Sequence, residues 1–182
     1  MAGHLPHALS DLAAATVGGT VYLVGGYDGA TPQSTIYSTT DGVHFTQAGT
    51  LPTGLRYASV AASGSDLVIA GGVSSAGPVS TVYRFDSTSG NVSVLGHLPS
   101  ALGHAAAVAL GDRVYVIGGL DAGGHAVRTV FQVDPAGGTV TRLADLARAV
   151  SDAAVAGTST EAWLLGGWDG RALAQVLHVR PR

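Results

Sequence analysis

The sequence contains few residue patterns that could carry catalysis or bind a metal ion. It has no cysteine, which excludes thiolate nucleophiles, thiolate metal ligands and disulfides. The seven histidines show neither His-x-His nor His-x-x-x-His spacing, so we expect no metal site and no cofactor. Ser65 and Ser159 stand in turn-like segments, outside any Gly-x-Ser-x-Gly motif of a nucleophilic serine. We therefore expect no catalytic residue of these kinds.

The aspartates leave one catalytic possibility open. Paired carboxylates supply general acid–base chemistry in glycosidases. Five aspartates stand in predicted loops and could converge in this way, namely Asp11, Asp28, Asp121, Asp152 and Asp169. Two of them precede glycine, which is ordinary turn chemistry. No pattern pairs them specifically, so their role depends on the elements that position them.

Composition favours an all-β protein. Glycine accounts for 27 of 182 residues, about twice the usual share, and the acids are nearly all aspartate, which favours turns over helices. A net charge of −3 without a basic stripe argues against nucleic-acid binding. No apolar run is long enough to span a membrane. We expect a soluble protein, cytoplasmic or extracytoplasmic in a parent protein with a signal or anchor.

Two sequence markers recur in the same phase. Gly-Gly pairs follow short apolar runs at Gly25-Gly26, Gly71-Gly72, Gly118-Gly119 and Gly166-Gly167, with steps of 46, 47 and 48 residues. A second pair keeps the same steps at Leu5-Pro6, Leu51-Pro52, Leu98-Pro99 and Leu146-Ala147. A fixed period of this kind indicates a repeat architecture. We divide the single domain 1–182 into repeats at about 5–50, 51–97, 98–145 and 146–182.

Each repeat is predicted to contain up to four short strands. The first is rich in small residues, at 12–17, 58–62, 105–110 and 153–156. The second is a β-branched or aromatic run that ends in Gly-Gly, at 21–24, 67–70, 114–117 and 162–165. The third follows at 34–38, 80–85, 128–133 and 174–179. The fourth occurs three times, at 43–47, 91–95 and 139–143. Small first strands fit the crowded axis of a propeller, where the blades converge.

The repeats resemble the kelch family of β-propellers. The resemblance rests on the Gly-Gly pairs, on an aromatic or apolar residue shortly before them, and on a hydrophobic–aromatic pair 10 to 12 positions later. That pair reads Ile36-Tyr37, Val82-Tyr83 and Val130-Phe131, with Val176-Leu177 in the last repeat. The fourth strands lack the tryptophan that kelch repeats tend to carry, and lysine is absent, which points to a divergent, bacterial type. The resemblance implies a kelch-type propeller of four repeats with about four antiparallel strands each.

The resemblance also implies an incomplete ring. Kelch propellers usually have six or seven blades, and the fourth repeat here ends soon after its third strand. That strand, at 174–179, has an apolar edge without lysine or internal proline to block pairing. We expect a partial or fragment propeller that closes by self-association, for example as two copies forming an eight-bladed ring. A closed four-bladed monomer is the alternative.

Ligands of kelch propellers usually dock on one rim, where the loops between second and third strands meet the loops between repeats. Loops on a rigid scaffold often carry function. The candidates on this rim are Asp11, Tyr27, Asp28, Arg56, Tyr57, His104, Asp121, Asp152, Trp168, Asp169 and Arg171. Aromatic faces and polar groups of this kind could hold a peptide or a sugar. Alternatively, several of them only bond to loop backbone.

These observations favour a non-enzymatic binding or scaffold module with a protein or glycan ligand. The first alternative is a carbohydrate-active kelch enzyme similar to sialic-acid isomerases, for which Arg56 and Arg171 are the rim cations. The copper-oxidase activity known in the family needs a Tyr–Cys cross-link and is excluded by the absence of cysteine. The second alternative is an engineered propeller fragment without a function of its own.

Overall fold

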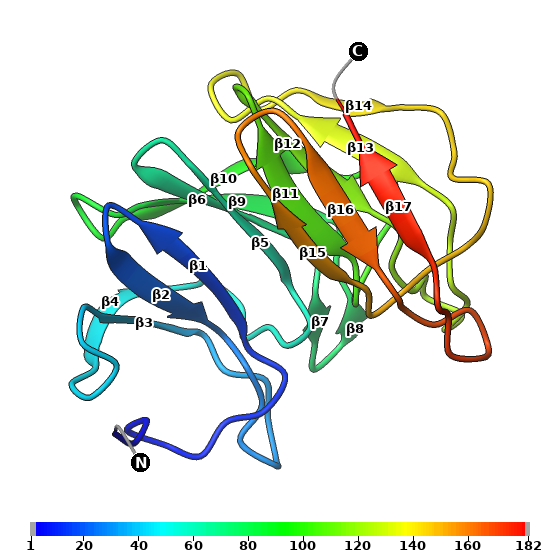
Figure 1. Cartoon of the computed structure of the whole chain (residues 1–182). Coiled ribbons are helices and arrows are strands. Elements are labelled where there is room, and N and C mark those ends of the chain that lie inside the picture. Colours follow the sequence, from blue (N-terminus) through cyan, green and yellow to red (C-terminus); the bar gives the residue numbers. More distant parts are fainter. Residues whose placement is uncertain (1–2, 181–182) are drawn as a thin grey trace.

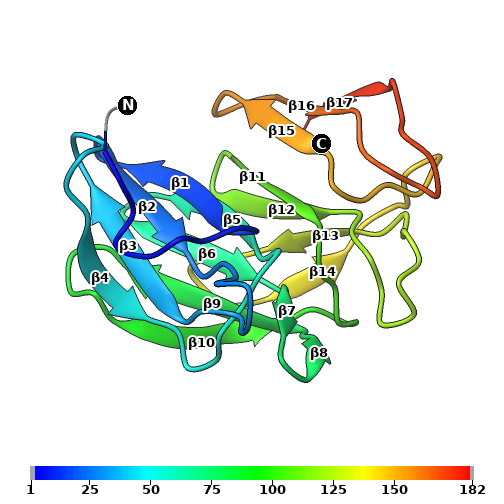
Figure 2. The same cartoon turned by 90° about the horizontal axis from the view of Figure 1, so that it is seen from below.

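The computed structural model describes residues 3–180, which form seventeen β-strands and no helix. Four antiparallel sheets, one for each repeat, stand side by side and fan out from a common axis (Figure 1, Figure 2). This confirms the predicted all-β propeller, and each sheet is a blade. Within the described residues there is accordingly no helix that could span a membrane.

The strands of each blade follow one another outward from the axis. Blade 1 contains β1 (Ala13–Val17), β2 (Thr20–Val24), β3 (Thr35–Thr39) and β4 (Thr46–Thr50). Blade 2 contains β5 (Ser59–Ser63), β6 (Asp66–Ala70), β9 (Thr81–Asp86) and β10 (Val92–His97), with the short hairpin of β7 (Val73–Ser74) and β8 (Gly77–Pro78) between β6 and β9. Blade 3 contains β11 (Ala106–Leu110), β12 (Arg113–Ile117), β13 (Val130–Val133) and β14 (Val140–Arg142). Blade 4 contains β15 (Ala154–Gly157), β16 (Ala162–Leu165) and β17 (Val176–Val179).

The predicted strands are confirmed to within two residues at each end, with two larger differences. The fourth strand of blade 1 begins at Thr46 and not at residue 43. The carboxylate of Asp41 accepts the backbone N–H groups of Val43 and His44, each at 2.8 Å, and thereby holds both residues in the turn. The hairpin β7–β8 was not predicted, because it is a two-residue pairing inside one loop of one repeat.

Three apolar cores hold the blades together, one at each junction between neighbours. Each core combines one face of a blade, the opposing face of the next blade and an apolar residue from the segment between them. Representative members are Ile36, Leu55 and Phe85 at the first junction, Val82, Leu102 and Phe131 at the second, and Ile117, Val150 and Leu164 at the third. Burial of one such side chain stabilises the fold by about 1.5–3 kcal/mol. Within residues 3–180 no fourth core joins blade 4 to blade 1.

The segments between blades, which we call connectors, run over residues 51–57, 98–104 and 146–152. The last apolar residue of each connector places its carbonyl against the first glycine of the preceding blade's Gly-Gly pair. A Cβ atom on Gly25, Gly71 or Gly118 would lie 2.1, 2.3 or 2.1 Å from the carbonyl oxygen of Leu55, Leu102 or Val150, respectively. These glycines also have φ of 63–64°. Both the close approach and the left-handed backbone therefore require glycine.

We predict that Gly71→Ala destabilises the protein more than Gly64→Ala. Both glycines have a left-handed backbone, with φ of 63° and 61°, and alanine there costs about 1–2 kcal/mol. Gly64 has open space around its Cβ position, whereas Gly71 faces the carbonyl of Leu102. We therefore expect a further loss of about 1–3 kcal/mol for Gly71→Ala, as in other overpacked sites. Urea unfolding measures both; equal losses would show that the connector can shift without cost.

Candidate functional site

One residue in each repeat has an unusual backbone conformation. Asp11, Tyr57, His104 and Asp152 have φ of 57°, 53°, 59° and 53°, and they are the non-glycine residues with positive φ within the described chain. Each stands two residues before the innermost strand of its blade. A left-handed residue costs about 1–2 kcal/mol, so four equivalent cases call for a structural cause.

The cause is a chain of backbone hydrogen bonds that crosses from repeat to repeat. The N–H of Tyr57 donates to the carbonyl of Asp11, that of His104 to Tyr57, and that of Asp152 to His104, each at 3.0 Å. In this left-handed conformation, the N–H groups of Tyr57, His104 and Asp152 point toward the preceding repeat. The side chains lie on the rim. Backbone geometry thus brings four side chains, two of them aspartates, together where the innermost strands begin. Together with Arg56, we call these residues the axial cluster.

Side-chain contacts join the members from repeats two, three and four. The rings of Tyr57 and His104 are stacked, with centroids 3.7 Å apart and planes 22° apart. His104 Nδ1 lies 2.6 Å from Asp152 Oδ1. The hydroxyl of Ser151 donates to the other carboxylate oxygen of Asp152 at 2.8 Å. The side chain of Asp152 is nevertheless 48% exposed, so its carboxylate remains open to a ligand.

Arg56 occupies the space between the first two repeats. Its guanidinium carbon lies 4.6 Å from the ring centroid of Tyr27 and 5.3 Å from that of Tyr57, within the range of cation–π attraction. Its Nη1 is 3.9 Å from a carboxylate oxygen of Asp11, which makes a loose ion pair. Its Nε is buried and has no hydrogen-bond partner within the described chain.

The cluster contains two carboxylates, those of Asp11 and Asp152, and one guanidinium, that of Arg56. The carboxylate of Asp11 interacts with the hydroxyl of Tyr57 and is the main cause that raises the pKa of Tyr57 above its usual range, with burial as a smaller cause. Tyr57 therefore stays a neutral phenol at physiological pH. The cluster therefore places the carboxylates of Asp11 and Asp152 beside the rings of Tyr57 and His104.

Two of the other predicted site residues, Asp28 and Asp121, bind backbone N–H groups of the loops in which they stand. The carboxylate of Asp28 accepts the backbone N–H groups of Ala30 and Thr31 at 2.8 and 2.7 Å, and the bond from Thr31 contributes most to lowering the pKa of Asp28. The carboxylate of Asp121 accepts the N–H of His125 at 2.9 Å, which likewise lowers its pKa. Both aspartates therefore hold turns, as the Asp-Gly sequence predicts for Asp28.

The remaining predicted residues lie in the loop of blade 4. Asp169 pairs with Arg148, and this ion pair is the main cause that lowers the pKa of Asp169. The carbonyl of Arg171 closes the turn by accepting the N–H of Asp169 at 3.2 Å. Trp168 pairs with Ser151 through the backbone and leaves its side chain 48% exposed. The predicted set omitted Arg148, which stands at no marked position of the repeat, and Ser151, although Ser151 aligns with Arg56.

A small cavity adjoins the axial cluster. It has a volume of about 170 Å³ and lies between the hairpin β7–β8 and the loop after β12. Val73 and Pro78 line one side, Leu120 and Asp121 the other, and His104 faces it. Its size suits a single side chain. The unpredicted hairpin forms one wall, so sequence analysis could not locate this cavity.

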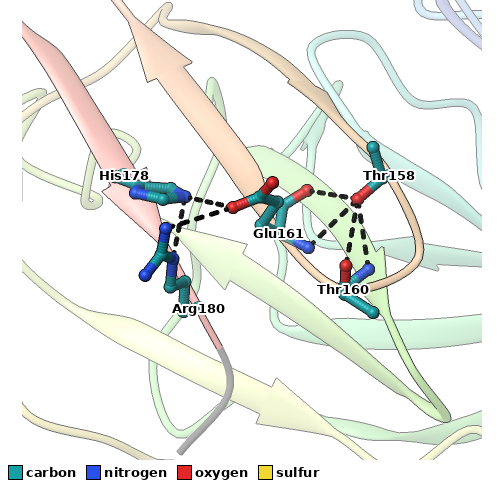
Figure 3. A network of polar contacts seen from close by, with 5 residues as sticks. All are labelled: Thr158, Thr160, Glu161, His178 and Arg180. Atoms are coloured by element: carbon teal, nitrogen blue, oxygen red, sulfur yellow. Dashed lines mark hydrogen bonds and ion pairs between the residues drawn. The ribbon is translucent and has the colours of Figure 1, made fainter.

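A second group of polar residues lies on blade 4 (Figure 3). The carboxylate of Glu161 is 2.8 Å from Nε2 of His178 and 3.4 Å from the guanidinium of Arg180. The ring of His178 also stacks on Trp163, with centroids 5.1 Å apart. Thr158 caps the turn between β15 and β16 through its hydroxyl. These residues bind one another and enclose no cavity. Among the described residues no three His, Asp or Glu side chains gather as metal ligands would.

The axial cluster contains part of a catalytic arrangement. The His104–Asp152 pair resembles a general base with its orienting carboxylate. A nucleophile would need a hydroxyl bonded to the imidazole. The hydroxyl of Ser151 bonds to Asp152 instead, and within residues 3–180 no serine or threonine hydroxyl bonds to His104. The cluster thus places aromatic rings beside charged groups.

Radial sheets joined at three apolar junctions, with a loop-built cluster on one rim, define the protein as a β-propeller. A profile of the Kelch motif matches residues 8–38, 54–99 and 101–147, more than half of the chain, and the protein belongs to the Kelch-repeat family. The matched segments include three of the four left-handed positions. Among curated proteins, no sequence matches the chain.

We predict that Asp11→Asn shifts the ionisation of Tyr57 to lower pH. The carboxylate that disfavours the phenolate is then replaced by a neutral amide, so the raised pKa of Tyr57 falls toward its usual value. NMR titration of ¹³Cζ-labelled tyrosine measures this shift, with Tyr57→Phe used to assign the signal. Asp28→Asn is the control and should leave the titration unchanged. An unchanged curve in Asp11→Asn would rule out the contact.

Proposed function

We propose that the protein is a non-enzymatic binding module whose axial cluster holds a segment of a protein partner. One observation carries the proposal: four positions with the same backbone geometry bring aspartate, tyrosine and histidine side chains together on one rim. Aspartate and histidine are common at a left-handed backbone, so their type alone follows from the fold. Tyr57 is not a typical residue there, and its contacts with His104 and Arg56 add chemistry that the backbone does not require.

The contacts within the cluster favour a peptide over a sugar. Sugars bind on free aromatic faces, yet one face of Tyr57 is covered by His104, and Arg56 lies over Tyr27. The group left most open is the carboxylate of Asp152, whose side chain is 48% exposed, and a carboxylate favours basic or amide donors through charge-assisted hydrogen bonds. The carboxylate of Asp11 is 21% exposed and lies in the same cluster. The adjoining cavity can take one side chain of such a peptide. A lysine or arginine of the partner would match these carboxylates.

A glycan ligand is the second candidate, and one observation favours it. Trp168 stands on the same rim and keeps an exposed ring. The carbohydrate-active enzyme alternative has less support, since Arg56 is the one guanidinium of the axial cluster. No contact joins Arg171 to the axial cluster within the described chain.

We predict that Asp11→Asn combined with Asp152→Asn weakens peptide binding at least tenfold. An array of short synthetic peptides that vary in charge identifies a binder, and fluorescence anisotropy measures its dissociation constant. A tenfold loss corresponds to about 1.4 kcal/mol, a modest value for two charged contacts. The double substitution should also reduce the dependence of binding on salt concentration.

Asp112→Asn is the matched control. Asp112 is an exposed aspartate in the turn between β11 and β12, at the opposite rim. Its substitution should leave peptide binding unchanged. A glycan array is probed in parallel; sugar binding that Trp168→Ala abolishes, without any peptide binder, would replace the proposal by the glycan reading. Equal binding by the double variant and the native chain would reject the axial cluster as the site.

A further inference from the structure

Blade 4 leaves uncovered the face that the other blades bury against their successors. In each blade this face contains a cross-strand pair from the second and third strands, Val24–Ile36, Ala70–Val82, Ile117–Val130 and Leu165–Val176. The first three pairs are at most 8% exposed, whereas Leu165 and Val176 are 39% and 62% exposed. The last pair is equally apolar, so its exposure does not follow from its chemistry; within residues 3–180 no neighbouring blade covers it.

The backbone of blade 4 also has unpaired groups at the positions where the other three blades bond to a connector. At each of the three junctions, the connector makes the same three backbone hydrogen bonds to the preceding blade. At the first junction the N–H of Gly26 donates to Leu55 at 2.8 Å, the N–H of Leu55 to Gln33 at 2.9 Å, and the N–H of Leu51 to Ser34 at 2.8 Å. The second and third junctions repeat this pattern at 2.7–3.2 Å.

In blade 4 the equivalent groups are the N–H of Gly167 and the carbonyls of Leu173 and Ala174. Within residues 3–180 none of these groups makes the corresponding bond. The space beside Gly166 is open as well. A Cβ atom there would meet nothing nearer than the carbonyl of Leu173 at 3.5 Å, whereas the three equivalent glycines each face a connector carbonyl.

Residues 3–9 have the sequence and position of a connector that contacts no preceding blade within the described residues. Leu5 and Leu9 align with Leu51 and Leu55 of the next repeat. The latter pair is fully buried, but Leu5 and Leu9 are only half-buried. Within the described chain, the N–H groups of Leu5 and Leu9 and the carbonyl of Leu9 have no backbone partner. The two ends thus carry matching sets of unpaired groups.

The start of this segment matches the end of a fourth strand. Gly3 packs against the carbonyl of Gly42 in the outer turn of blade 1. Gly49 and Gly96 pack in the same way against Gly90 and Gly138 of the blades that follow them. In their own blades, Gly49 pairs with Ile36 and Gly96 with Val82. By this equivalence, Gly3 would pair with Val176, on the unpaired edge of β17.

We propose that residues 3–9 of a second copy of this chain dock on blade 4. The N–H of Gly167 then donates to the carbonyl of the incoming Leu9, whose own N–H donates to Leu173. The N–H of the incoming Leu5 donates to Ala174, and its Gly3 extends along β17. In the second copy, the face of blade 1 that points away from blade 2 covers Leu165 and Val176.

The occupant is a second copy because the chain's own residues 3–9 are held on blade 1 by Gly3 and by the pairing of Ser10 with Tyr27. Blade 1 and blade 4 share no apolar core within the described residues. The contact joins different surfaces of the two copies. When each copy also docks its residues 3–9 on blade 4 of the other, the two copies close a ring. This inference specifies the self-association expected from the sequence and is independent of the ligand at the axial cluster.

Cysteine cross-linking tests the register, because the native chain has no cysteine. His4 would lie opposite Gln175, as Thr50 lies opposite Thr35 in blade 1. We expect His4→Cys and Gln175→Cys, on separate chains and mixed under mild oxidation, to form a disulfide-linked pair. His7→Cys, an exposed position of the same segment, should not cross-link with Gln175→Cys. Cross-linking only within one chain of the double variant would show that the chain closes on itself, and would overturn the proposal.

Sedimentation equilibrium tests the covered face. We expect the native chain to exceed its 18.1 kDa monomer mass with rising concentration, and Val176→Arg to raise the dissociation constant at least tenfold. Val94→Arg, at 58% exposure on the outer strand of blade 2, is the matched control and should associate as the native chain does. A native chain that stays monomeric at every concentration, or equal association by both variants, would refute the docking.

A glycine substitution separates docking from folding. Gly166→Ala places a methyl group where the incoming carbonyl of Leu9 would lie, so it should abolish association. Gly64→Ala carries the same backbone penalty, with φ of 61° against 66°, in open space, and it should leave association intact. Both variants should unfold at similar urea concentrations when dilute. Undiminished association of Gly166→Ala would contradict the proposed position of Leu9.

Discussion

The arrangement of the blades depends on one backbone contact, between a connector carbonyl and the first glycine of the preceding Gly-Gly pair. The carbonyls of Leu55, Leu102 and Val150 approach so closely that no side chain fits beneath them. This contact fixes the distance between neighbouring blades and seats an apolar residue of the connector in each core. Blades of this kind cannot bury both of their faces alone, so the stability of each depends on its neighbours, as in other repeat proteins.

Much of this fold could be predicted from the sequence, because the required residues recur. Gly-Gly marks a left-handed backbone position that strongly favours glycine, and the strands around it follow from short β-branched runs. The start of β4 could not be predicted, since it depends on how the carboxylate of Asp41 captures two backbone N–H groups. The hairpin β7–β8 is formed in the loop of a single repeat, so the comparison of repeats could not predict it.

The candidate site was predictable in part for the same reason. Asp11, Tyr57, His104 and Asp152 share one phase of the repeat, and their convergence follows from that phase. The sequence could not distinguish them from Asp28 and Asp121, since an aspartate that caps a turn and an aspartate that faces a ligand look alike in a loop. Only the hydrogen bonds from neighbouring backbone N–H groups separate the two roles.

The chain of hydrogen bonds through the four left-handed positions uses backbone atoms alone. The fold therefore requires a backbone angle at these positions and does not require a particular side chain. Under the proposed function, point substitutions among aspartate, asparagine, histidine and tyrosine change what the rim binds while the blades stay in place. β-Branched residues are the exception, since they fit a left-handed backbone poorly. Each repeat would then contribute one variable position to the proposed binding surface.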